Sequence, residues 1–106
     1  MKLLVTIATA EPEAAFNALR LALFARQQGD EVTVFLIGKG VELDQITAAP
    51  FDAKAQAEAL LAAGGSIQAC GTCLQLRHSE GSEVCPLSTM QTLYDLVAGA
   101  DRVVSF

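Results

Sequence analysis

Two cysteines separated by two residues are the positions in this sequence best suited to chemistry. Cys70 and Cys73 stand in the segment ACGTCL, residues 69–74, where a short apolar run meets the start of a predicted helix. A thiol at the amino end of a helix faces unpaired backbone N–H groups and the positive end of the helix dipole, and both favour the thiolate. Because the thiolate is the nucleophilic form of cysteine, this pattern indicates attack on sulfur. The alternative is that Cys70 is a small buried apolar residue at the end of a strand.

Two other residues, Arg77 and Cys85, lie later in the chain and extend this candidate site. Arg77 follows Cys73 by about one helical turn and would add positive charge near the thiols. Cys85 ends a second short apolar run, as Cys70 ends the first. Since consecutive strands usually lie side by side, the thiols of Cys70 and Cys85 would meet at one edge of a sheet. The alternative for Cys85 is a buried cysteine before a proline turn.

The same cysteines also raise the question of metal. Cys70, Cys73, His78 and Cys85 approach the spacing of a zinc knuckle, with a longer last gap. A knuckle folds around its metal because it has no core, whereas this chain has enough apolar residues to build one. The loop after the first strand lacks the glycines of a dinucleotide site, and residues 38–40 (GKG) lack the phosphate-loop pattern. We therefore expect no metal and no organic cofactor.

Apolar runs predict the strands that must position these residues. Runs rich in aliphatic and β-branched residues indicate buried strands over residues 2–8, 31–37, 66–70 and 102–106. A brief strand over residues 83–85 would be stopped by Pro86. The CxxC pair thus follows the third strand, whereas a thioredoxin-like dithiol follows an early strand and opens a long helix. That rival assignment fits the spacing poorly.

Helical spacing of apolar residues alternates with these strands. It predicts helices over residues 12–28 and 53–63, the second capped by Asp52, and a short helix over residues 74–78. Ser88 and Gln91 form a capping box for a last helix that ends at Gly99. Residues 41–50 have a weak pattern, typical of a loop with about one helical turn. The alternation indicates a small doubly wound α/β fold with parallel strands, helices on both faces, and ligands at the carboxyl ends of the strands.

Length, composition and charge bound the kind of protein. The 106 residues, 52% of them hydrophobic and 18% charged, suit one domain over residues 1–106 and are too apolar for a disordered chain. The net charge of −5 argues against nucleic acid and anionic membrane as partners. Residues 1–10 imitate a secretory signal but serve better as a buried strand. Three cysteines in a chain with its own core indicate reduced thiols and a cytoplasmic protein.

Several short segments resemble the DsrE/DsrF-like family of small sulfur-relay proteins, which includes the TusD and YchN-like groups. The resemblance covers the whole chain. It is carried by the first strand ending in threonine and by residues 29–32 (GDEV), 40–41 (GV), 69–73 (ACGTC) followed by Arg77, 88–90 (STM) and 100–106 (ADRVVSF). The cysteine segment, which matches a CGTC-containing subgroup, and the closing strand are the most specific parts.

This resemblance implies a mostly parallel five-stranded sheet and assembly into homotrimers or homohexamers. Cys70 would accept sulfane sulfur as a persulfide from a donor protein or small thiol and pass it to an acceptor. Cys73 would assist, or would resolve the persulfide by attacking it. The candidate pocket residues are Thr9, Gly71, Thr72, Arg77 and Cys85.

A second function is left open by the same residues. Residues 78–80 read His-Ser-Glu where many relatives read Arg-Gly, so the resemblance does not name the substrate of the pocket. The cysteines could instead belong to a non-catalytic homo-oligomeric module that binds metal or a small ligand.

Overall fold

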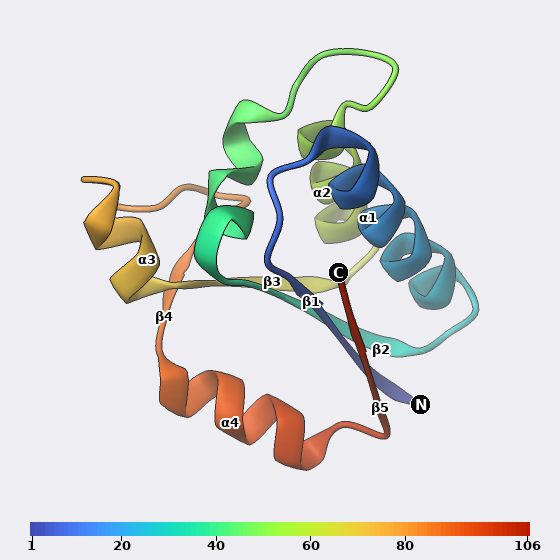
Figure 1. Cartoon of the computed structure of the whole chain (residues 1–106). Helices are drawn as coiled ribbons and strands as arrows, with labels where there is room; N and C mark the ends of the chain where they lie inside the picture. Colours follow the sequence, from blue (N-terminus) through green and yellow to red (C-terminus); the bar gives the residue numbers. More distant parts are fainter.

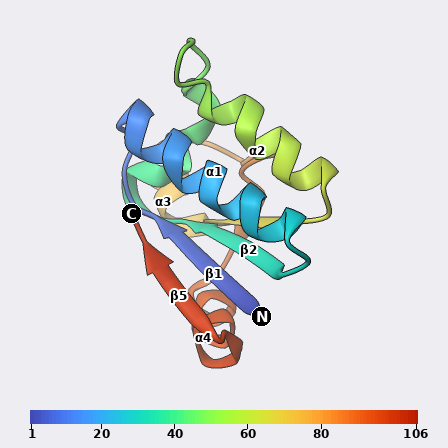
Figure 2. The same cartoon turned by 90° about the vertical axis from the view of Figure 1, so that its right-hand side faces the viewer.

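Five parallel strands form the central sheet of the structure, a computed structural model that describes residues 1–106. The strands are β1 (Lys2–Ile7), β2 (Glu31–Leu36), β3 (Ser66–Cys70), β4 (Leu87–Ser88) and β5 (Arg102–Ser105). They lie in the order β4-β3-β2-β1-β5, and every neighbouring pair is parallel. Figure 2 shows β5, β1 and β2 side by side.

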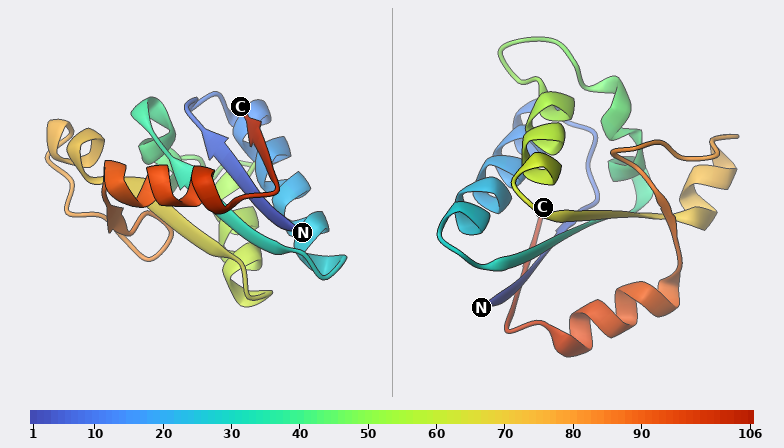
Figure 3. Two further views of the ribbon diagram at one scale, coloured as in Figure 1. Left: turned by 90° about the horizontal axis from the view of Figure 1, so that it is seen from below. Right: turned by 180° about the vertical axis from the view of Figure 1, so that it is seen from behind.

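Helices cover both faces of this sheet. α1 (Pro12–Gln27) and α2 (Ala53–Ala62) pack against each other on one face, and α4 (Met90–Gly99) crosses the other (Figure 1). Seen from below, α4 is the helix nearest the viewer (Figure 3). The 3-10 helix η1 (Gly38–Gln45) and α3 (Gly71–Leu76) follow the carboxyl ends of β2 and β3. The predicted doubly wound α/β class is confirmed.

Burial on both faces explains why the inner strands are so apolar. Val5, Ile7, Val34 and Phe35 have no exposed surface, as expected of parallel strands covered by helices on each side. Small side chains on the inner stripe of α1 let this helix approach the sheet closely, since Ala15, Ala18, Ala22 and Ala25 are all buried. The result is one core of aliphatic strand residues and helix alanines.

Two predictions near the end of the chain are wrong by a few residues. The fourth strand lies at Leu87–Ser88, after Pro86, and not at residues 83–85. Proline is tolerated here because β4 is an edge strand and the Pro86 carbonyl accepts a bond from the Ala69 N–H at 2.9 Å. Since Ser88 then pairs with Cys70, the cap of α4 moves to Thr89, whose hydroxyl accepts from the Thr92 N–H at 3.2 Å.

Two shorter elements also differ from the sequence prediction. α3 begins at Gly71 and not at residue 74, so the whole CxxC segment lies at its start. Residues 38–45 form the 3-10 helix η1, which begins earlier and runs further than the single helical turn predicted within the loop over residues 41–50. A 3-10 helix repeats every three residues, and its buried Val41 and Leu43 do not follow the 3.6-residue spacing that marks an α-helix.

The outer side of α4 is apolar and exposed. Leu93 and Leu96 pack partly against the core, but no residue of α4 is fully buried. Met90, Tyr94 and Val97 stand 59%, 70% and 48% exposed at helical spacing, and these three residues are named the α4 stripe. Contiguous exposed apolar surface of this kind marks interaction sites in soluble proteins. None of the helices has the length and hydropathy needed to cross a membrane.

Candidate dithiol site

An open groove of about 430 Å³ lies at the carboxyl ends of β2, β3 and β4. Ile37 follows β2, the CxxC segment follows β3, and the last residue of β4 leads into the first residues of α4. The residues that line the groove are Ile37, Cys70, Gly71, Thr72, Cys73, Gln75, Ser88, Thr89 and Met90. The groove is therefore at the edge of the sheet where parallel α/β proteins gather their chemistry.

Cys70 is fixed by both of the elements it joins. It is the last residue of β3, it pairs with Ser88 of β4, and it is the residue from which α3 starts. The residue as a whole is 5% exposed. Gly71 follows in close contact with β4, since a Cβ at this position would lie 2.8 Å from the Ser88 carbonyl oxygen. The sulfur of Cys70 is thus held at the floor of the groove by backbone on two sides.

Cys73 stands one turn into α3, half-buried, with its thiol beside that of Cys70. Its Sγ accepts a hydrogen bond from the backbone N–H of Gly38 in η1 at 3.3 Å. Burial and the hydrogen bond to Cys70 raise the pKa of the Cys73 thiol, while the Gly38 N–H and the charge of Arg77 lower it. The first two causes prevail, so Cys73 is held as a thiol.

Arg77 does not line the groove, although its charge is close enough to act on Cys73. Its Nε donates to the Glu42 carboxylate of η1 at 2.8 Å, and its Nη1 donates to the Cys73 carbonyl oxygen at 3.1 Å. Glu42 and Gly38 are site residues that sequence reasoning missed. Each lies 35 residues from its partner, and no local pattern connects them.

Cys85 lies apart from the groove that Cys70 and Cys73 share. It is fully buried before Pro86, ends no strand, and has Asp44, Lys54 and Ser82 as its polar neighbours. The predicted meeting of Cys85 with Cys70 depended on a strand over residues 83–85, and that strand is absent. Burial raises the pKa of the Cys85 thiol to about 11, which suits an inert core residue.

Two further candidates also stand outside the groove. The Thr9 hydroxyl accepts a hydrogen bond from the Glu11 N–H at 3.0 Å in the loop before α1. His78 has a left-handed backbone with φ of 53° at the end of α3. No three His, Cys, Asp or Glu side chains come together in a way that could hold a metal ion, so the zinc-knuckle set is not assembled.

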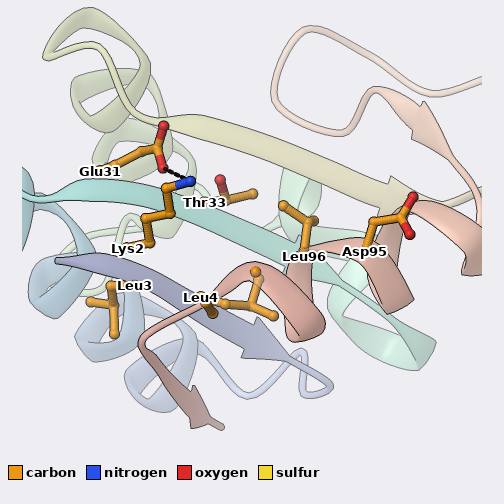
Figure 4. Close-up of a pocket in the computed structure, with 9 residues that line it drawn as sticks. Lys2, Leu3, Leu4, Glu31, Thr33, Asp95 and Leu96 are labelled. Carbon is orange, nitrogen blue, oxygen red and sulfur yellow. Dashed lines mark ion pairs between the residues drawn. The ribbon is translucent and has the colours of Figure 1, made fainter.

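A second, smaller hollow of about 150 Å³ lies at the opposite ends of the strands, beneath α4 (Figure 4). Lys2 and Glu31 stand at its rim with their charged atoms 3.9 Å apart, and Asp95 and Leu96 of α4 close it. It contains no cysteine and lies at the amino ends of β1 and β2. The groove at the carboxyl ends therefore remains the candidate site.

Comparison with protein-family models shows the family to which the chain is related. The model of the DsrE/DsrF-like family matches residues 1–106. The chain belongs to the DsrE/DsrF-like family. Membership implies a role of the sulfur-relay type, and members typically form oligomers. Assignment to a CGTC-containing subgroup stays a prediction, because the match is to the family as a whole.

Individual relatives extend over nearly the full chain. An uncharacterized protein of Methanopyrus kandleri is 35% identical over 89% of this chain and 83% of its own length. An uncharacterized protein of Methanocaldococcus jannaschii is 31% identical over 97% and 96%. Among solved structures, the ychN protein of E. coli is similar over the whole of both chains, with a TM-score of 0.83 and 25% identity. A conserved protein of unknown function from Bacteroides thetaiotaomicron shares the fold, with a TM-score of 0.78 and 18% identity over 99% and 94%.

Proposed function

We propose that this DsrE/DsrF-like protein handles sulfane sulfur, with Cys70 as the residue that carries it. The observation behind the proposal is the pair of adjacent thiols, Cys70 and Cys73, in an open groove at the carboxyl end of β3. A single buried cysteine would have no resolving partner. Two thiols within hydrogen-bond reach can both accept a sulfur atom and release it.

The surroundings of the two thiols indicate which of them reacts first. Cys73 is held protonated by burial and by its bond to Cys70, so Cys70 is assigned as the first nucleophile. Its thiolate attacks the outer sulfur of a donor persulfide, R–S–SH. The new bond joins Cys70 to that sulfur, the S–S bond of the donor breaks, and the donor leaves as the thiolate R–S⁻. The product is a Cys70 persulfide with no net oxidation or reduction.

Cys73 then provides a route to discharge the sulfur inside the same groove. Its thiolate attacks the inner sulfur of the Cys70 persulfide, the S–SH bond breaks, and hydrosulfide leaves. The two electrons taken up by the departing sulfur come from the two cysteines, which are left as a Cys70–Cys73 disulfide. An external dithiol must reduce this disulfide before the next cycle. Where an acceptor thiol reaches the persulfide first, the sulfur atom is transferred and no disulfide forms.

Intact-mass measurement of the reduced protein after incubation with a charged sulfurtransferase or thiosulfate tests this proposal. We expect the unaltered chain, and Cys85→Ser as the matched control, to gain the mass of one sulfur atom and then to lose it as sulfide when the Cys70–Cys73 disulfide forms. Cys70→Ser should show no adduct. Cys73→Ser should accumulate the adduct and release no sulfide. An adduct that persists in Cys70→Ser, or no adduct in Cys73→Ser with either donor, contradicts the proposal.

The proposed setting is a homo-oligomer, a homotrimer or homohexamer, in the cytoplasm. The α4 stripe supplies exposed apolar surface for subunit contacts, and free cysteines suit a reducing compartment. Sulfur donors and acceptors would be proteins or small thiols that reach the open groove. Light scattering during gel filtration measures the assembled mass, and a mass equal to that of one chain would contradict the oligomer.

A further inference from the structure

Two contacts tie α3 and Arg77, the residue that follows it, to η1. The Gly38 N–H donates to Cys73 Sγ at 3.3 Å, and the Arg77 Nε donates to Glu42 Oε2 at 2.8 Å. Figure 1 shows η1 in green and α3 in gold on the same side of the sheet. The position of Cys73 therefore depends on a segment that comes from a different part of the chain.

Arg77 is held between Cys73 and Glu42. Its Nη1 donates to the Cys73 carbonyl oxygen at 3.1 Å, so the guanidinium stays within a turn of the thiol. The side chains of Arg77 and Glu42 are 31% and 32% exposed, so the pair is partly withdrawn from solvent. A carboxylate in direct contact cancels part of the positive charge that would otherwise favour a thiolate at Cys73.

We propose that Glu42 is a positioning residue for the dithiol: it holds Arg77 in place and offsets its charge, so that Cys73 remains a thiol until Cys70 has reacted. The role assigned to the Glu42–Arg77 pair, keeping Cys73 a thiol until Cys70 has reacted, rests on the proposed function. The effect of the pair on the acidity of Cys73 does not rest on it, because the reactivity of the thiol can be measured without any sulfur donor.

Four groups act on the Cys73 sulfur or on its charged neighbour. They are the Cys70 thiol from β3, the Gly38 N–H and the Glu42 carboxylate from η1, and the Arg77 guanidinium after α3. Neutralising Glu42 leaves the first two unchanged and removes the counter-charge of Arg77. Because an unopposed cation favours the thiolate, Cys73 should then lose its proton at lower pH.

The test is the pH dependence of Cys73 alkylation by iodoacetamide in a Cys70→Ser background, followed by intact mass. We expect Glu42→Gln to lower the pH midpoint by roughly 0.5 to 1 unit and Arg77→Gln to raise it by a similar amount. Glu42→Asp, which keeps the charge, should restore most of the original midpoint. The double variant should behave as Arg77→Gln alone, because Glu42 acts through Arg77.

Glu31→Gln is the matched control, since it removes one carboxylate at the amino end of β2, far from the groove. An equal shift in Glu31→Gln would mean that only net charge matters and would overturn the proposal. An unchanged midpoint in folded Glu42→Gln, with folding checked by circular dichroism, or a shift that persists without Arg77, would also overturn it. If the midpoint moves as expected while no donor loads Cys70, the proposed function fails and this inference stands.

Discussion

Cys85 and Cys73 differ in what surrounds the sulfur, and the difference has consequences for stability as well as reactivity. Cys85 is fully buried, and the nearby Asp44 carboxylate adds to the cost of ionising it. Cys73 is reached from the groove and has an N–H donor and a cation beside it. At pH 8 we expect iodoacetamide to modify Cys73 and to leave Cys85 intact in the folded protein.

Ionisation of Cys85 should also weaken the fold at alkaline pH. Its pKa rises from the ordinary value of 9.0 to about 11 in the folded chain. Between these values the unfolded chain loses the thiol proton while the folded chain keeps it, so stability is intact below pH 9 and falls as pH rises toward 11. We expect this group to account for roughly 2 kcal/mol of the free energy of unfolding across that interval.

Urea unfolding of the unaltered chain and of Cys85→Ala over this pH range provides the measurement. The alanine variant loses some packing but has no thiol to ionise, so its stability should fall less steeply with pH. Equal slopes for the two proteins would show that Cys85 does not titrate as its burial requires.

The sequence was informative about Cys70 and Cys73 and silent about their partners, for a physical reason. The CxxC spacing after an apolar run is local, and it located the strand end at Cys70, which the structure confirms, and a helix after it that starts three residues earlier than predicted. The contacts of Glu42 and Gly38 join residues 35 apart, and only the folded chain brings them together. Arg77 was predicted to add charge near the thiols and to line the pocket. Its charge does act on Cys73, but it pairs with Glu42 and does not line the groove, which the sequence could not show.

At the scale of elements, α3 and β4 approach each other so closely that the residue between them must be small. A Cβ on Gly71 would lie 2.8 Å from the Ser88 carbonyl oxygen, which is backbone and cannot move aside cheaply. We expect Gly71→Ala to push β4 away from β3, lowering the free energy of unfolding by about 1 to 3 kcal/mol and slowing sulfur loading of Cys70.

Gly99→Ala is the matched control for this substitution, since nothing lies within 4 Å of a Cβ at that position. Gly99 ends α4 without a left-handed backbone, so alanine should be neutral or stabilise the fold by up to about 1 kcal/mol. Denaturant unfolding of both variants checks the pair of expectations. Equal free energies of unfolding for the two variants would show that the close contact of α3 with β4 does not restrict the size of residue 71.

The cap of α4 offers a second test at this scale. Thr89 accepts a hydrogen bond from the Thr92 N–H, whereas Ser88, the residue predicted from the sequence, makes no such bond. Thr89→Ala should therefore cost about 1 kcal/mol of stability, and Ser88→Ala less than half of that. Urea unfolding measures both variants. A larger loss of stability for Ser88→Ala than for Thr89→Ala would show that Ser88 caps the helix, as the capping box predicts.

The predicted bounds of helices and strands were wrong where neighbouring residues have similar propensity for a position and strand pairing in the folded protein decides between them. Ser88 and Thr89 are both good caps, and the choice was made by the pairing of Ser88 with Cys70 in the sheet. β4 has only two residues, too few for any periodic pattern. The long strands β1, β2 and β3 were predicted to within one residue, because strands buried on both faces have continuous apolar sequences.

At the scale of the whole molecule, the two faces of the sheet are covered unequally. α1 and α2 bury one face, while α4 alone crosses the other and leaves the α4 stripe in solvent. Tyr94, at 70% exposure, is the most exposed member of the stripe. If subunits meet there, Tyr94→Glu should place a desolvated charge in the contact and shift the assembly toward single chains.

Gel filtration with light scattering at several concentrations measures this shift. Glu58→Gln on α2 is a suitable control, because it changes charge on the opposite face of the sheet. An unchanged mass for Tyr94→Glu would place the subunit contacts elsewhere, and monomeric behaviour of the unaltered chain would exclude them.

The pairing of β1 with β5 sets a limit on when the sheet can be completed during synthesis. Residues 3–6 lie against residues 102–105, and the Lys2 N–H donates to Asp101, 99 positions away. As the chain leaves the ribosome, β1, β2 and β3 can assemble early, but one side of β1 must wait for the last segment. Throughout that interval β1 presents unpaired backbone groups, which are a template for pairing with other chains. The vulnerable edge of this protein while it is being made is thus the one farthest from its thiols.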